Sequence, residues 1–204
     1  MQFNVIAISR TLGAGGESLG EALADALGFR YVDSEIIDRA AALANATPSE
    51  VAQVEARKGL LGRILENLAR TGGAGGMVEP VLIDITTPGY EQLIVDVIRE
   101  TAAMGMAVIV AHGASIPLAG TPGVLRVMVT ASTNTRAARV AQAESVDPDR
   151  ARKLVADSDA ARADYFHRFY HLERELPTNY DLVVNTDVLT VEQAQAAVLA
   201  IALT

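Results

Sequence analysis

The stretch that decides the fold is NVIAISRTLGAGGES, residues 4–18, close to the start of the chain. Its first part, residues 4–9, is a short and mostly apolar run of the kind that forms a parallel strand covered on both faces. A turn with the glycines Gly13, Gly15 and Gly16 follows, and Leu19, Leu23 and Leu27 then recur at helical spacing. The sequence therefore predicts a strand, a glycine-rich turn and a helix.

The predicted turn has the properties of an anion-binding loop. Glycines allow positive φ angles and a close approach to a ligand, and the unpaired N–H groups at the start of a helix favour a negative charge. A phosphate group is the ligand that fits such a turn best. The strict Walker A motif is absent, because Gly16 stands where its Lys is expected and Glu17 stands where its hydroxyl residue is expected. A tight strand-to-helix connection that binds nothing is the alternative.

Composition restricts the classes of function. With 204 residues, of which 50% are hydrophobic, the chain is expected to form one domain with a substantial core. The formal net charge of -8 gives no basic footprint for nucleic acid or an anionic membrane surface. The chain has no cysteine, no signal-peptide pattern and no apolar run near the roughly 20 residues of a membrane span. We therefore expect a cytoplasmic protein with neither a nucleic-acid nor a membrane partner.

Strands and helices alternate along the rest of the chain. Strands are predicted at residues 29–32, 107–111, 124–129 and 182–184, and the helices between them include 88–104 and 148 to about 170. This alternation predicts an α/β fold with a mostly parallel sheet and helices on both faces. Ligands of such sheets bind beyond the carboxyl ends of the strands. Those ends are residues 9–16, 33–34, 112–115 and 130–132.

A second glycine cluster, residues 71–76, follows a predicted helix and not a strand. It lacks the context of a phosphate-binding turn, so we interpret it as a loop, with a flap over a substrate as the alternative.

Several of these segments together match a known pattern. The order of Ser9-Arg10, Gly13-Ala14-Gly15-Gly16 and Tyr31-Val32-Asp33-Ser34, followed by Asp159, Arg162 and residues 180–187, resembles the cytidylate kinase-like family, relatives of the P-loop nucleoside monophosphate kinases. The resemblance implies one three-layer α/β domain over residues 1–204, with a P-loop NTPase-like sheet of about five parallel strands. It also implies a helical insertion at about 34–87 on the monophosphate side and lid-like helices at about 145–175.

The resemblance implies phosphoryl transfer from ATP, with Mg²⁺, to a nucleoside monophosphate such as CMP or dCMP, or to a similar small molecule. Gly13, Ala14, Gly15, Gly16, Glu17 and Ser18 would bind the donor phosphates. Asp33, Ser34, Arg39 and His112 would bind the acceptor. Arg10, Arg139 and Arg162 would be the catalytic cations, with Arg126, Arg136 and Arg152 as further phosphate contacts, although each arginine could instead form a surface salt bridge. No residue is expected to ligate a metal directly.

Two positions depart from the family pattern. Glu17 stands where the family tends to have an arginine, and Ala111-His112 replaces a Gly-Arg pair after the third strand. Both changes remove a permanent cation from the expected phosphate site. Three hypotheses therefore stay open: a nucleoside monophosphate kinase, a catalytically impaired kinase fold that binds nucleotides or a partner, and a kinase with a different small acceptor. The balance favours an enzyme, and a homo-oligomer is left open.

Overall fold

A computed structural model describes residues 2–44, 47–49, 89–110 and 113–204, and the structural statements below concern these residues. The elements, in chain order, are β1 (Val5–Arg10), α1 (Gly16–Leu27), β2 (Arg30–Val32), α2 (Glu35–Ala44), α5 (Gly89–Met104), β3 (Ala107–Ile109), β4 (Val124–Thr130), α6 (Thr133–Glu144), α7 (Pro148–Tyr170), the 3-10 helix η1 (Pro177–Asn179), β5 (Leu182–Asn185) and α8 (Val191–Ala202).

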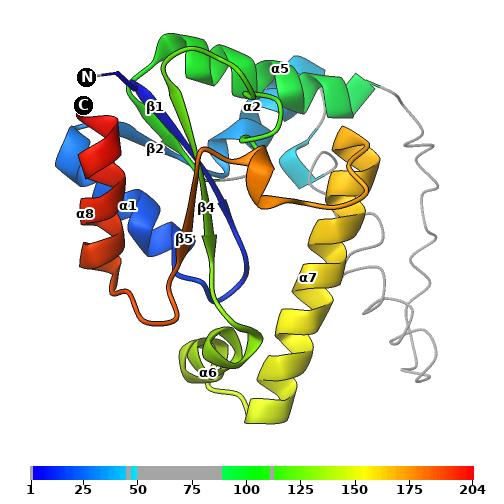
Figure 1. The fold of residues 1–204 in the computed structure, drawn as a ribbon. Helices are drawn as coiled ribbons and strands as arrows, with labels where there is room; N and C mark the ends of the chain where they lie inside the picture. Colours follow the sequence, from blue (N-terminus) through cyan, green and yellow to red (C-terminus); the bar gives the residue numbers. More distant parts are fainter. Residues whose placement is uncertain (1, 45–46, 50–88, 111–112) are drawn as a thin grey trace, which may run out of the picture.

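The strands form one parallel sheet in the order β2-β3-β1-β4-β5 (Figure 1). In its register, Ala7 of β1 pairs with Ile109 of β3 on one side and with Arg126 of β4 on the other. The α/β fold with five parallel strands, predicted from the sequence, is confirmed. Because all strands run the same way, the segments that follow β1, β3 and β4 emerge at one edge of the sheet.

Helices cover both faces of the sheet and give three layers (Figure 1). On one face α2 and α5 pack on Val5 and Ala7, and on the other α1 and α8 pack on Ile6 and Ile8. Successive residues of β1 thus enter opposite cores, which explains why its apolar run is continuous and does not alternate. Helix α1 lies so close to the sheet that a Cβ atom on Gly20 would be 2.6 Å from Val110.

The predicted strand boundaries are close to the observed ones. The second strand begins at Arg30 and not at Phe29, because the N–H of Phe29 donates to the carbonyl of Ala24 and so completes the end of α1. Gly28 ends α1 with a φ of 64°, as its position in the sequence predicts. Thr190 caps α8 as expected and forms a capping box with Gln193.

Helices α6 and α7 extend from the sheet edge at which β4 ends (Figure 1). They pack on each other through a small separate core of Ala137, Val140, Ala151 and Val155. Asp147 caps α7, whose carboxyl-terminal turns carry an aromatic cluster of Tyr165, Phe166, Phe169 and Tyr170. Phe169 joins the core beneath α2 and α5, so one end of α7 is anchored in the main domain. The segment at about 145–175, predicted as lid-like helices, consists largely of α7, one helix of 23 residues.

Several sequence-based expectations lie outside the described residues. These are the glycine cluster at residues 71–76, most of the insertion at about 34–87, and the Ala111-His112 pair. Within the described part of the chain, every helix is too short or too polar to cross a membrane.

Candidate functional site

The glycine-rich turn lies between β1 and α1, at the edge of the sheet where the strands end. Gly13 and Gly15 have φ angles of 78° and 81°, in the left-handed region that favours glycine. A Cβ atom on Gly13 would also lie 2.7 Å from the carbonyl oxygen of Arg136, so the turn packs directly on the backbone of α6. Gly15 faces open space, since a Cβ atom built there has no neighbour within 4 Å.

The amino end of α1 differs from those of α6, α7 and α8. Gly15 occupies its N-cap position, and no side chain caps it. The other three helices are capped by Ser132, Asp147 and Thr190, each through a side-chain oxygen. The first N–H groups of a helix have no partner within the helix, and the macrodipole gives this end a partial positive charge. The turn thus presents an uncapped positive helix end.

Three successive carbonyl groups of the turn are bonded to residues of α6 and of the segment after β5. The carbonyl of Leu12 accepts from Nη1 of Arg136 at 3.4 Å, and that of Gly13 accepts from Nη1 of Arg139 at 3.3 Å. The carbonyl of Ala14 accepts from the Thr186 hydroxyl at 2.8 Å. These bonds direct the three carbonyl groups toward α6 and the segment after β5, and so away from the open face of the turn at Gly15.

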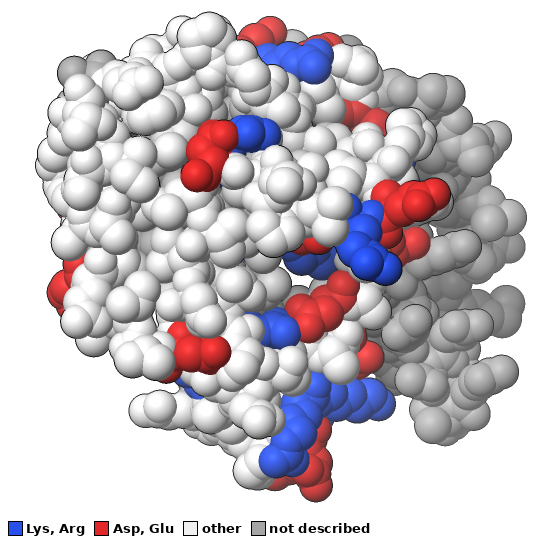
Figure 2. Space-filling view, in the orientation of Figure 1, with Lys and Arg blue, Asp and Glu red and all other residues white. Residues whose placement is uncertain are grey.

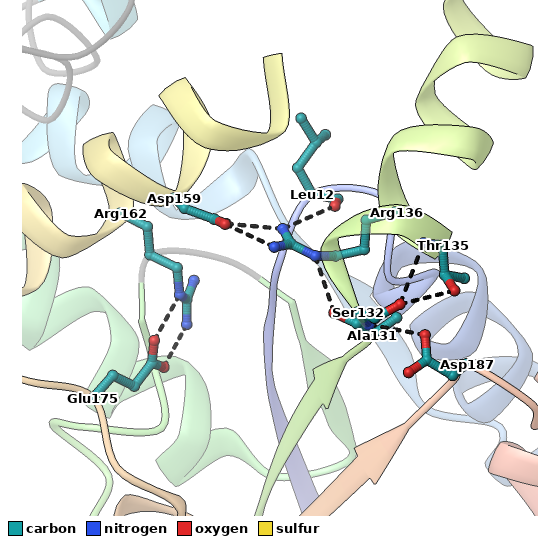
Figure 3. A network of polar contacts seen from close by, with 9 residues as sticks. All are labelled: Leu12, Ala131, Ser132, Thr135, Arg136, Asp159, Arg162, Glu175 and Asp187. Carbon is teal, nitrogen blue, oxygen red and sulfur yellow. Dashed lines mark hydrogen bonds and ion pairs between the residues drawn. The ribbon is translucent and has the colours of Figure 1, made fainter. Parts of the chain in front are cut away.

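Arg136 is also the centre of a polar network that reaches α7 (Figure 3). Its guanidinium forms two hydrogen bonds with the carboxylate of Asp159, of 2.8 and 2.7 Å, and its Nε donates to the carbonyl of Ala131. Arg136 is only 5% exposed, and the carboxylate of Asp159 provides a counter-charge for its buried guanidinium.

Two further arginines near the turn are paired with carboxylates. Nε of Arg10 lies 2.7 Å from Oε1 of Glu17, an ion pair by distance and not a well-aligned hydrogen bond. Arg162 makes two hydrogen bonds with Glu175, of 2.8 and 2.6 Å, and its guanidinium lies 4.5 Å from the centre of the Phe166 ring. Of the arginines expected to be catalytic, Arg139 alone has no carboxylate partner among the described residues.

Two cavities flank the turn. The first, of about 330 Å³, lies toward α8 and is lined by residues of the turn and α1 (Ala14, Gly15, Ser18, Leu19), by Arg139 and by Thr186, Leu189, Thr190, Val191 and Ala194. The second, also of about 330 Å³, lies toward α7 and is lined by Arg10, Leu12, Glu17, Gly113, Ser158, Ala161, Arg162, Tyr165 and Phe166. Arg10, Glu17 and Arg162 thus come together in the second cavity.

A third cavity, of about 250 Å³, shares Arg162 and Phe166 with the second and extends toward Glu175. Figure 2 shows an opening near the middle of this face of the molecule, with basic and acidic side chains next to one another around it. The close pairing of charges agrees with the three arginine–carboxylate pairs described above.

The residues expected on the acceptor side are less closely assembled. Asp33 and Ser34 follow β2 at the same sheet edge, but neither lines the three cavities described above. Arg39 points toward α5, where it donates to Thr101 at 3.0 Å and to Glu100 at 3.1 Å. His112 lies outside the described residues.

Two of the additional arginines lie away from the turn. Arg126 is near the start of β4, at the opposite end of the strand, where it pairs with Asp181 and holds the pKa of that carboxyl below its usual value. Arg152 pairs with Asp149 on the exposed first turns of α7. The spacing of three residues on a predicted helix is compatible with the Arg152–Asp149 pair, whereas nothing in the sequence indicated the partner of Arg126, which is 55 residues away.

Asp187, to which the sequence analysis assigned no role, helps to fix the start of α6. Its carboxylate accepts the N–H of Ser132 at 2.8 Å, and so joins the segment after β5 to the start of α6. Hydrogen bonds from the Thr135 hydroxyl and from Ser132 lower the pKa of Asp187 from 3.8 to about 2. Thr186 and Glu175 were likewise not assigned a role, because their contacts are distant in sequence and follow no local pattern.

The residues that the structure describes contain no group of three or more histidine and carboxylate side chains arranged to hold a metal ion. The carboxylates of Glu17, Asp159 and Glu175 around the turn are each paired with an arginine.

A parallel sheet covered on both faces, with a glycine turn leading into an uncapped helix, defines this molecule as an α/β protein with a P-loop kinase-like fold. The chain belongs to the cytidylate kinase-like family, whose sequence profile matches residues 5–188. This match confirms the resemblance seen in the sequence.

Solved structures agree on the fold. An uncharacterized protein from Eubacterium ventriosum is similar with a TM-score of 0.66 and 18% identity, over 98% of both chains. Shikimate kinase from Bacteroides thetaiotaomicron has a TM-score of 0.54 and 16% identity over 98% of both chains. A gluconokinase from Sinorhizobium meliloti has a TM-score of 0.52 and 15% identity over 100% of this chain and 97% of its own. Identity this low establishes the fold alone. No curated protein matches the sequence.

Proposed function

We propose that the protein binds ATP at the turn between β1 and α1 and transfers its γ-phosphoryl group to a small acceptor, with CMP or dCMP as the first candidates. The observation that carries this proposal is the uncapped amino end of α1, preceded by Gly13 and Gly15 in left-handed conformations. Exposed N–H groups and the helix dipole favour a polyphosphate there. Family membership supports the same ligand class.

The nucleoside of ATP would occupy the cavity between the turn and α8. This cavity has apolar walls from Leu19 and Leu189, and its polar groups include the guanidinium of Arg139. The donor phosphates would extend from it along residues 13–18. Because the described residues offer no carboxylate cluster, a magnesium ion would be coordinated mainly by the phosphates and water, and would screen their charge.

The acceptor would occupy the cavity between the turn and α7, which both Arg10 and Arg162 line. Phosphoryl transfer breaks the bond between the γ-phosphorus and the bridging oxygen and forms one to an acceptor oxygen, so catalysis depends on alignment and on positive charge. We assign that charge to Arg10, Arg139 and Arg162. Asp33, Ser34 and His112 stay proposed acceptor contacts. Asp33 and Ser34 do not line this cavity, so an acceptor that reaches them would extend beyond it, and Arg39 would have to leave its partners on α5.

Activity requires a redistribution of charge pairs. In the structure Arg10 is paired with Glu17 and Arg162 with Glu175, so neither offers a full positive charge to a phosphate. The Arg10–Glu17 pair is partly exposed and poorly aligned, so it contributes little net stability. The Arg162–Glu175 pair has two hydrogen bonds and side chains only 19% and 20% exposed, so separating it requires a stronger competing anion. A bound phosphate, which carries more charge than a carboxylate, can therefore take over these arginines.

The same pairs favour a second candidate function, that of a kinase fold that binds nucleotide without transferring phosphate. If the carboxylates of Glu17 and Glu175 keep their arginines, the turn still binds polyphosphate through its N–H groups, but the transferred group loses the cationic stabilisation of Arg10 and Arg162.

A coupled assay of ADP formation separates these candidates. The protein would be incubated with ATP and Mg²⁺ and with each common nucleoside monophosphate, and also with shikimate and gluconate, which the names of fold neighbours suggest. We expect one monophosphate to raise ADP release at least tenfold over the acceptor-free rate. ATP binding in calorimetry without turnover would favour the binding module, and absence of ATP binding would refute both.

Two glycines at opposite ends of α1 provide a matched pair of variants. Gly15 and Gly28 both have positive φ angles, 81° and 64°, and both face open space, so alanine strains each to a similar degree, about 1 kcal/mol. We expect Gly15→Ala to weaken ATP binding at least tenfold and Gly28→Ala to leave it within twofold. Equal affinities in calorimetry would show that the phosphates bind elsewhere.

A further inference from the structure

Thr186 stands where the segment after β5 meets the glycine turn. It is 6% exposed, and its backbone N–H donates to the carbonyl of Thr130, which fixes the residue against the end of β4. Its hydroxyl donates to the carbonyl of Ala14 at 2.8 Å and accepts from Nη1 of Arg139 at 3.0 Å. A second bond of 2.6 Å runs from Nη2 of Arg139 to the Thr186 carbonyl.

These bonds determine how the hydroxyl is used. A hydroxyl group has one hydrogen to donate and can accept from another group. Since Arg139 has no acceptor lone pair, it takes the accepting side of the Thr186 oxygen and leaves the hydrogen to a carbonyl. Two carbonyls are within reach, that of Ala14 at 2.8 Å and that of Thr130 at 3.3 Å, and the shorter distance favours Ala14. The arginine thus orients the hydroxyl, and the hydroxyl holds the turn.

The bond to Ala14 has a consequence for the anion site, because a trans peptide group is planar and its C=O and N–H point in opposite directions. No described peptide bond is cis, so holding the Ala14 carbonyl toward Thr186 directs the N–H of Gly15 away from Thr186. On its Gly15 side the peptide group has no side chain beside it, and a Cβ atom built there would have no neighbour within 4 Å.

A peptide group next to glycine can flip with little steric resistance. In the flipped orientation the Ala14 carbonyl would replace the Gly15 N–H at the amino end of α1 and would repel an anion there. We propose that Thr186, oriented by Arg139, is a positioning residue for polyphosphate binding, which it controls by fixing the Ala14–Gly15 peptide group. This inference rests on the proposed function, because it presumes that the turn binds phosphates.

The test compares Thr186→Val, which removes the hydroxyl but keeps the branched shape, with Thr186→Ser, which keeps the hydroxyl. Ser115→Ala is the matched control, because Ser115 is fully buried and also donates to a main-chain carbonyl, that of Ala7 within β1. Calorimetry with inorganic tripolyphosphate and with ATP gives the affinities, and thermal unfolding gives the stabilities. Tripolyphosphate is used because Thr186 and Arg139 also line the nucleoside cavity, which this probe does not fill.

We expect Thr186→Val to weaken tripolyphosphate binding at least tenfold and Thr186→Ser to stay within threefold of the unchanged protein. Ser115→Ala should lower the melting temperature without changing affinity. If Thr186→Val does not fold, Thr186→Ala provides the second variant, since it also removes the hydroxyl but leaves a smaller side chain, and we expect it to weaken tripolyphosphate binding at least fivefold.

Several outcomes would overturn the inference. Unchanged tripolyphosphate affinity in Thr186→Val, or in Thr186→Ala if that variant replaces it, would do so. This includes the case in which only ATP affinity falls, which would assign Thr186 to the nucleoside. An unchanged protein that binds ATP but no tripolyphosphate would also contradict it. A protein that binds neither probe would refute the proposed function as well, so the two failures are distinguishable.

Discussion

Asp159 of α7 and Arg136 of α6 form a pair of hydrogen bonds, 2.8 and 2.7 Å long, that joins the two helices beside the glycine turn. The same guanidinium donates to the carbonyl of Leu12, so the position of α7 is linked to that of the turn (Figure 3). Arg136 is buried, whereas the side chain of Asp159 is 41% exposed.

The first prediction concerns this pair. Asp159→Asn would leave a buried guanidinium without its counter-charge, at a cost of about 1–2 kcal/mol once the exposure of Asp159 is taken into account. We expect a melting temperature lower by about 3–8 °C in calorimetry. Asp149→Asn is the control, because it removes an exposed partner of Arg152 on the same helix. If the two variants lowered the melting temperature equally, the Arg136–Asp159 pair would contribute no more stability than the exposed Arg152–Asp149 pair.

The sequence predicted the fold well because the information is local. Continuous apolar runs mark the strands, and Thr190 and Gly28 mark helix ends by their own chemistry. The order of the strands in the sheet is not a local property, and the sequence analysis predicted none; the order β2-β3-β1-β4-β5 comes from the structure.

The site was predicted less completely. The glycine turn has a local signature, but the partners of its arginines do not. Nothing in the spacing of Arg162 and Glu175, or of Arg139 and Thr186, indicates that they meet, because 47 residues separate the latter pair. Arg39 was expected to bind the acceptor, but nothing in the sequence indicated that it donates to Thr101 and Glu100 of α5.

The second prediction concerns Glu17. Replacing it by Gln frees Arg10 and removes a negative charge from the first turn of α1, which changes the interaction with a nearby phosphate by about 1 kcal/mol. We expect Glu17→Gln to bind ATP about fivefold more tightly in calorimetry, and Glu17→Arg more tightly still. Glu35→Gln is the control, since Glu35 pairs loosely with Arg30 on the surface. Unchanged or weaker affinity in Glu17→Gln would indicate that this turn does not face the phosphates.

The third prediction concerns the packing of α7 on the segment after β3. Gly113 has a φ of 61°, and a Cβ atom there would lie 2.9 Å from Tyr170 and 3.1 Å from Phe166. Gly120 has a similar φ of 71° but open space. We expect Gly113→Ala to cost about 2–3 kcal/mol in urea unfolding and Gly120→Ala about 1 kcal/mol. If both variants cost the same, the aromatic cluster does not hold α7 against this segment.

The fourth prediction concerns acid stability. Because the folded protein lowers the pKa of Asp187 from 3.8 to about 2, its ionised form stabilises the fold at pH values above about 4. That contribution is lost as the pH falls from about 4 to about 2. In Asp187→Asn, stability measured by urea unfolding should vary less over this range than in the unchanged protein. A parallel pH dependence in both proteins would exclude Asp187 as a source of it.

The account depends most on where the phosphates bind, and a crystal structure with a non-hydrolysable ATP analogue measures this directly. We predict triphosphate density within hydrogen-bonding distance of the N–H groups of residues 13–18, with Arg10 or Arg162 moved from its carboxylate partner toward the phosphates. Triphosphate density at any other place, or side chains that fill the amino end of α1 while the analogue is bound elsewhere, would contradict the central claim.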